Sequence, residues 1–189
     1  MNGDSALLIM DYQVGVLAQL PDGDALAAKM SEVRDDAKDV GVKAIYVTVG
    51  FRPGHPEVSS QNKMFSGIAS HGGMVVGSPE AAIHPHVSPE NEDPVVIKHR
   101  VGAFRNTDLL QMLRAHQISK LALAGVATKG VVLSTLRDAA DLDFQTVVLR
   151  DLCGDVDDEV QEFLMNKVFP VQADVLSSEA WVESLTSEK

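Results

Sequence analysis

Residues 6–11 read Ala-Leu-Leu-Ile-Met-Asp, a continuous apolar run that ends directly at a carboxylate. A run without polar alternation is typical of a strand that is buried on both faces of a parallel sheet. Further apolar runs predict strands over 43–49, 95–98, 120–126, 145–150 and 173–176. Between them, apolar residues recur at helical spacing, which predicts helices over 24–41, 107–116, 128–142, 157–167 and 178–185. This alternation indicates βα units and a parallel sheet covered by helices.

Residues 51–94 interrupt this alternation. They contain six of the eight prolines and four of the six histidines of the chain. A connection that long inside a compact domain usually has a function, so we expect it to help form a pocket or an oligomer contact. The sequence shows no internal repeat and no second domain, and we expect one domain over residues 1–189.

Composition and charge exclude several classes of function. With 16 basic and 27 acidic side chains, the net charge is 16 − 27 = −11, which disfavours nucleic acid and anionic membranes as partners. The apolar runs are far shorter than the roughly 20 residues of a membrane span. The start of the chain lacks the basic segment of a signal peptide. The single cysteine excludes internal disulfides and cysteine-rich zinc sites. We therefore expect a soluble, cytoplasmic protein that binds a small molecule.

Two ionisable residues lie at the ends of predicted strands. In an open parallel sheet, ligands bind beyond the carboxyl ends of the strands. Asp11 follows the first strand, where partial desolvation would raise its pKa and suit it to acid or base catalysis. Lys98 ends the third predicted strand and would bring an ammonium group to the same edge. Taken alone, Asp11 also fits a turn or helix cap, and Lys98 a surface lysine with a buried stem.

A third feature is the crossing from the fourth strand into a helix. Residues 125–132 read Gly-Val-Ala-Thr-Lys-Gly-Val-Val. Backbone N–H groups at a helix N-terminus stabilise negative charge, so Ala127, Thr128 and Gly130 form a candidate cradle for an oxyanion or a carboxylate. Neither a P-loop nor a G-x-G-x-x-G motif is present, so nucleotide binding has no support.

These three features together resemble the isochorismatase-like hydrolase superfamily, which includes isochorismatases, nicotinamidases and N-carbamoylsarcosine amidases. The features are Asp11, Lys98 within Val95–Phe104, and Gly125–Thr128 before a helix. The likeness continues at 107–109, 136–140 and 167–170, so it covers nearly the whole chain. It implies a three-layer α/β/α sandwich with a six-stranded parallel sheet in the order 3-2-1-4-5-6. It also implies a cis peptide bond between Val126 and Ala127.

The chain departs from the superfamily at one decisive position. Amidases of this group carry a nucleophilic cysteine where this chain has Val131, and a valine cannot form a covalent intermediate. Neither Cys153 nor Ser134 is expected to replace that thiol. Isochorismatases work without the cysteine, because they hydrolyse a vinyl ether by protonating it.

Mapped onto this chain, the isochorismatase precedent makes Asp11 the general acid and Lys98 its catalytic partner. Arg52, Arg100 and Phe104 are then expected to bind the substrate. We therefore expect a hydrolase without a cysteine nucleophile, acting on a small carboxylated or cyclic substrate. The alternative is a catalytically inactive, small-molecule-binding member of the same fold.

The resemblance also bears on metals and assembly. Nicotinamidases of this group bind a metal through an aspartate and histidines after the second strand, but residues 51–56 contain no aspartate. His84 and His86 form a possible chelating pair near Glu90 but have no defined third ligand. We expect no metal and no cofactor, and the roles of His55, His84 and His86 stay open. Relatives assemble, so a homo-oligomer is expected.

Overall fold

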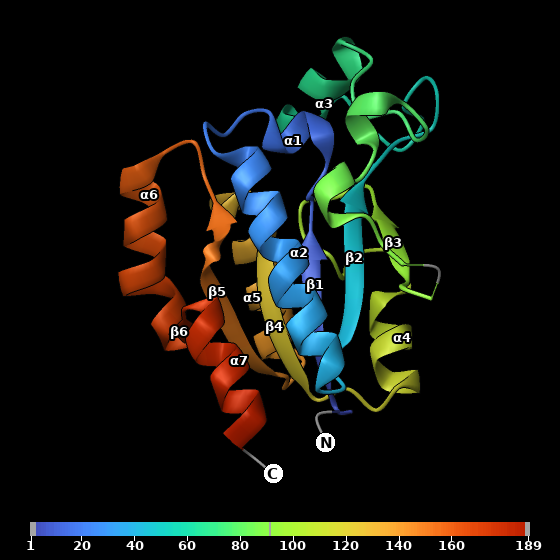
Figure 1. Cartoon of the computed structure of the whole chain (residues 1–189). Coiled ribbons are helices and arrows are strands. Elements are labelled where there is room, and N and C mark those ends of the chain that lie inside the picture. Colours follow the sequence, from blue (N-terminus) through green and yellow to red (C-terminus); the bar gives the residue numbers. More distant parts are fainter. Residues whose placement is uncertain (1–2, 91, 188–189) are drawn as a thin grey trace.

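The computed structural model describes residues 3–90 and 92–187 and contains one six-stranded parallel sheet (Figure 1). Its strands run in the order β3-β2-β1-β4-β5-β6, which confirms the expected topology. The strands are β1 (Ser5–Met10), β2 (Lys43–Val49), β3 (Val95–Lys98), β4 (Lys120–Val126), β5 (Gln145–Gly154) and β6 (Asp174–Leu176). Because strand order reverses between β1 and β4, these two neighbours border the position where ligands bind in such sheets.

Helices cover both faces of the sheet, as the resemblance implied (Figure 1). The α-helices are α1 (Val14–Leu17), α2 (Gly23–Asp39), α3 (Lys63–Ser70), α4 (Leu109–Ala115), α5 (Leu133–Asp141), α6 (Asp158–Phe163) and α7 (Ser178–Ser187). Shorter 3-10 segments are η1 (Pro79–Ala81), η2 (Pro85–Val87) and η5 (Phe169–Val171), and π-helical segments are η3 (Thr128–Val132) and η4 (Leu164–Val168). In the described part of the chain, no helix is long and apolar enough to span a bilayer.

Strand β1 shows why an uninterrupted apolar run fits this position. All six of its residues are buried. Leu7 and Ile9 belong to the cluster formed with α2 and α7, whereas Leu8 and Met10 belong to the cluster formed with α4, α5 and η4. Alternate side chains therefore enter two different cores, one on each face of the sheet.

Strand β5 differs from the prediction, because it continues four residues beyond Arg150. It pairs with β4 through Leu123 opposite Val148 and then Gly125 opposite Cys153. Between these pairs, β4 advances two residues (125 − 123) and β5 advances five (153 − 148), so β5 bulges. The bulge accommodates the charged residues at 150 and 151, and the strand then delivers residues 153–155 to the carboxyl edge.

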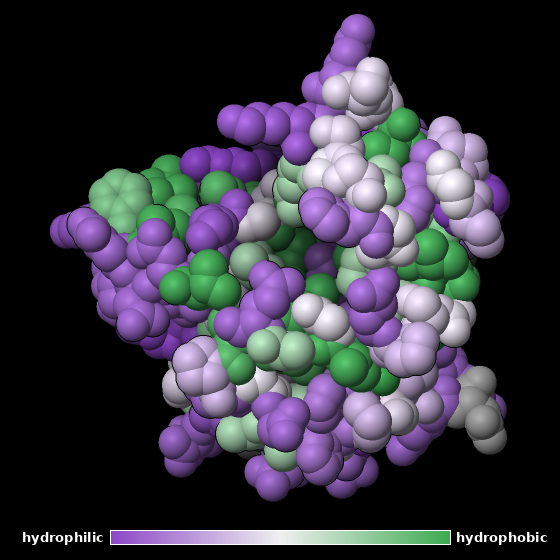
Figure 2. Space-filling view, turned by 90° about the horizontal axis from the view of Figure 1, so that it is seen from above, coloured by the Kyte–Doolittle hydropathy of each residue, from purple (hydrophilic) through white to green (hydrophobic). Residues whose placement is uncertain are grey.

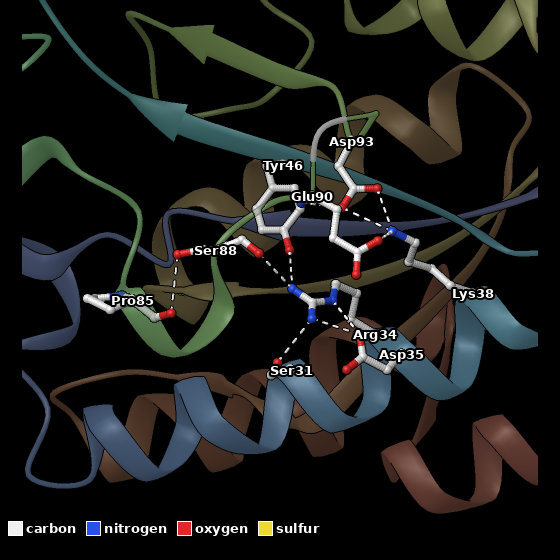
Figure 3. A network of polar contacts seen from close by, with 9 residues as sticks. All are labelled: Ser31, Arg34, Asp35, Lys38, Tyr46, Pro85, Ser88, Glu90 and Asp93. Atoms are coloured by element: carbon white, nitrogen blue, oxygen red, sulfur yellow. Dashed lines mark hydrogen bonds and ion pairs between the residues drawn. The ribbon is translucent and has the colours of Figure 1, made fainter.

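Two anchors hold the long 51–94 segment against the sheet. Gln13 is fully buried, and its Nε2 donates to Val49 O (2.9 Å) and Ala81 O (2.7 Å). Arg34 of α2 forms the second anchor (Figure 3), where Nη1 donates to Tyr46 Oη (3.0 Å) and Ser88 O (2.8 Å). These bonds fix the second half of the segment at Ala81 and Ser88. Helix α3 lies beyond the carboxyl ends of the strands (Figure 1).

Candidate active site

A pocket of about 420 Å³ opens at the carboxyl edge of the sheet. Figure 2 looks down on this edge and shows a hollow near its centre, with hydrophobic residues inside it and a rim of mixed hydropathy. Asp11 and Lys98 line it together with the turn after β4, including Ala127, Gly130 and Val131. Its apolar wall comes from several segments: Val16, Leu20, Val49, Met64, Phe65, Ile68, Met74, Val101, Val126 and Val156. Residues of the 51–94 segment therefore form part of this wall, as expected.

Asp11 and Lys98 form a buried ion pair in this pocket. The Lys98 Nζ lies 2.8 Å from Asp11 Oδ2, and the two side chains are 2% and 9% exposed. Asp11 adopts a left-handed conformation with φ of 58°, and its N–H donates to Val47 O (2.8 Å). Among residues 3–90 and 92–187, nothing hydrogen-bonds to Asp11 Oδ1, although this atom is buried. One oxygen of the buried carboxylate is therefore without a hydrogen bond from the described residues.

The environment of Asp11 contains two opposing influences on its pKa. Burial raises the pKa of the carboxyl group, while the Lys98 charge and its hydrogen bond lower it. Burial is the larger influence, so the pKa of Asp11 lies above its ordinary value of 3.8. A carboxyl group of raised pKa holds a proton closer to neutral pH, which suits a general acid.

The turn after β4 packs tightly against β1. The Val126–Ala127 peptide bond is cis in the structure. A Cβ on Gly125 would lie 3.0 Å from Met10 Cβ and 3.2 Å from Val131 Cγ1, so glycine permits this close approach. Val131 lines the pocket, whereas Thr128 is fully buried, and the structure does not place it in the pocket wall.

Sequence reasoning missed the residue that fixes this turn. The carboxylate of Asp155 accepts from Lys129 N (3.0 Å) and pairs with Lys129 Nζ (2.7 Å). Its side chain is fully buried, and it raises the pKa of Lys129 through that hydrogen bond. An acidic residue at the end of β5 was the available signal, but the predicted strand stopped at residue 150.

Three residues expected to bind substrate lie outside the pocket wall. Arg52 pairs with Glu57 (2.5 Å) and its side chain is 70% exposed. Arg100 donates to the carbonyl oxygens of His99 (2.5 Å) and Glu57 (3.2 Å). Phe104 packs on the core face and stacks with Phe144 at a centroid distance of 6.1 Å. In this structure, the three are held by other partners and do not meet Asp11.

The one cysteine of the chain is a core residue. Cys153 is buried among the apolar side chains beneath α5 and η4, and its Sγ lies 3.8 Å from Leu123 O. Burial raises the pKa of this thiol to about 12. Cys153 does not line the pocket. Its placement and its raised pKa both oppose a role as nucleophile.

The histidines are placed as structural or rim residues. His55 is buried and bonds Gly73 O (2.7 Å), and His84 meets Asp24 (3.1 Å). His71 lines the pocket, as does Glu80, whose Oε1 accepts from Met74 N (2.7 Å). Across residues 3–90 and 92–187, no three histidine, cysteine or acidic side chains gather as a metal site would require.

Known proteins share both this sequence pattern and this fold. An isochorismatase domain matches residues 5–180. The chain is 28% identical over 181 residues to YwoC, an uncharacterized isochorismatase family protein of Bacillus subtilis, with coverage of 96% of this chain and 94% of the relative. It is 25% identical over 174 residues to a maleamate amidohydrolase of Pseudomonas putida, with coverage of 92% and 78%.

A solved structure agrees with these sequence matches. An isochorismatase family protein of Burkholderia thailandensis superposes with a TM-score of 0.85 at 26% identity, and the alignment covers 98% of this chain and 97% of that one. The domain match spans most of the chain, and the solved fold shares its architecture. The chain therefore belongs to the isochorismatase family of hydrolases.

Proposed function

We propose that the protein hydrolyses a small cyclic substrate without a covalent enzyme intermediate, with Asp11 as general acid. The observation that carries this proposal is the buried Asp11–Lys98 pair in a pocket that Val131 lines. By the resemblance stated above, Val131 corresponds to the nucleophilic cysteine of the amidases. A relative that is an amidohydrolase makes amide hydrolysis one precedent. A valine at position 131 favours the other chemistry, acid-catalysed hydrolysis of a vinyl ether.

In this mechanism the proton comes from the Asp11 carboxyl group. Protonated Asp11 would donate to the β-carbon of a vinyl ether, and water would add to the resulting oxocarbenium ion. The hemiacetal or hemiketal then collapses to a carbonyl compound and an alcohol. Lys98 holds Oδ2 and stabilises the carboxylate that forms, while the buried Oδ1 has no hydrogen bond from the described residues.

Replacing Asp11 by asparagine tests the acid. Turnover of cyclic vinyl ethers found by a thermal-shift screen should fall by at least ~10²-fold in Asp11→Asn, the loss typical of a positioned acid. In the wild type, kcat should fall as pH rises through the raised pKa of Asp11, because only the protonated form donates. Rates are measured per folded molecule, with folding followed by circular dichroism.

Two outcomes separate the remaining possibilities. Undiminished turnover in Asp11→Asn would reject the acid role. Ligand binding without turnover in either protein would favour the second candidate, an inactive small-molecule-binding member. Two observations favour this inactive member: Val131 lines the pocket, and Cys153 is buried in the core outside the pocket wall.

A further inference from the structure

The lysines and arginines in and around the pocket already have partners. Lys98 pairs with Asp11 at 2.8 Å, and Lys129 pairs with Asp155 at 2.7 Å. Outside the wall, Arg52 pairs with Glu57. Over the described ranges, no lysine or arginine of the pocket wall lacks a carboxylate partner. A ligand carboxylate would therefore find no lysine or arginine in the described pocket wall that lacks a carboxylate partner.

Part of the backbone cradle at the start of η3 is also occupied. Lys129 N donates to Asp155 Oδ2 (3.0 Å), and Gly130 N donates to Ala127 O (3.0 Å). The Asp155 side chain is fully buried, so the chain supplies its own anion at this helix N-terminus. Two N–H groups of the turn where an oxyanion or carboxylate was expected, those of Lys129 and Gly130, are thus bonded within the chain itself.

The remaining pocket surface favours neutral ligands. Its wall is largely apolar, and the acidic side chain of Glu80 lies at its exposed part. The net charge of −11 repels anions at long range as well. A ligand carboxylate that reached Lys98 would be desolvated beside the buried Asp11 carboxylate, a like charge that shares the same ammonium group.

We infer that this pocket selects neutral, mainly apolar ring compounds with one hydrogen-bonding group directed at Asp11, and that it rejects carboxylates of the same shape. This preference defines a substrate class for the function proposed above. Turnover of such compounds rests on that proposed function, whereas their binding does not. The ligand preference follows from the pairing of Lys98 and Lys129 and from the apolar wall.

A matched pair of probes tests the preference directly. Naphthalene-2-carboxamide and naphthalene-2-carboxylate have the same shape and differ in charge at neutral pH. By titration calorimetry on the wild-type protein, the amide should bind at least ~10-fold more tightly, a difference of about 1.4 kcal/mol. Equal or tighter binding of the carboxylate, or no binding of the amide, would overturn the inference.

Asp155→Asn tests the physical cause. It removes the internal anion and leaves Lys129 without its counter-charge, so the preference for the amide should shrink by at least ~10-fold. Asp158→Asn is the matched control, because it removes the same charge from an exposed position in the first turn of α6. An unchanged preference in folded Asp155→Asn would contradict the role of Asp155.

Failure of this inference is distinguishable from failure of the proposed function. The probes report binding without any chemical step, so a preference for the amide stands even if Asp11→Asn retains full turnover. The wild-type comparison also decides the inference should Asp155→Asn fail to fold. Conversely, a preference for the carboxylate leaves the general-acid test with Asp11 untouched.

Discussion

Replacing Lys98 by methionine should lower the free energy of unfolding by about 3–5 kcal/mol at neutral pH, the loss typical when one partner of a buried ion pair is removed. Lys98 is 2% exposed, and its ammonium group lies 2.8 Å from Asp11. The variant would leave a buried carboxylate whose Oδ1 has no compensating hydrogen bond within the described residues. Guanidinium unfolding followed by circular dichroism measures the change.

The double variant Asp11→Asn/Lys98→Met provides the control. Removing both charges leaves no unpaired ion, so the double variant should be more stable than either single variant. Asparagine tolerates the left-handed backbone at position 11, where φ is 58°. A coupling free energy below about 1 kcal/mol would show that the two residues act independently, contrary to the ion pair in the structure.

The pH dependence of the Lys98→Met variant has a definite sign. The folded-state pKa of Asp11 lies above its ordinary value of 3.8, so its stabilising contribution is present below that value and is lost as pH rises through the raised pKa. Without Lys98, an influence that lowers this pKa is gone. The stability difference between wild type and variant should therefore shrink on acidification from neutral pH. A difference that grows instead would contradict the assignment to Asp11.

The centre of the sheet was predictable because the strands β1, β2 and β4 are buried on both faces. An apolar run such as 120–126 satisfies two cores at once, and few other structures require that pattern. The strands at 43–49, 95–98 and 120–126 have the predicted bounds. Strand order, in contrast, came from the resemblance, since no local pattern states which strands are neighbours.

Local elements that depend on tertiary contacts were missed. Helix α3 is short, and it begins where Asn62 accepts a hydrogen bond from Phe65 N within a segment rich in proline and glycine. The end of β5 was missed because charged residues at 150 and 151 suggested a strand terminus, whereas the bulge accommodates them. The role of Asp155 was missed because this residue follows the part of β5 that was not predicted.

The site was predictable in part for a similar reason. Asp11 and Lys98 are fixed by strand ends, so their meeting follows from the topology. Arg52, Arg100 and Phe104 follow strands or lie in loops, where side-chain direction depends on local partners such as Glu57 and Phe144. Sequence spacing does not encode those partners. Proximity in the chain was therefore not enough to predict whether these three side chains reach the pocket.

A cysteine placed at position 131 should react with iodoacetamide about 10³-fold faster than the native Cys153 at pH 8. With a pKa of about 12, only about 1 in 10⁴ of the Cys153 thiols is ionised at that pH. A thiol with an ordinary pKa near 8.5 is about one-quarter ionised, and Val131 lines the pocket. Intact-protein mass spectrometry over time separates single from double labelling of Val131→Cys.

Val132→Cys is the matched control for that experiment, because Val132 is fully buried in the core and does not line the pocket. Its thiol should stay as unreactive as Cys153. Rapid labelling of Val131→Cys alone would place position 131 in an accessible pocket. In the native chain, the accessible position 131 would then carry no thiol, whereas the thiol of Cys153 would be inaccessible to the reagent. Labelling of the wild type at the rate of Val131→Cys would instead restore Cys153 as a candidate nucleophile.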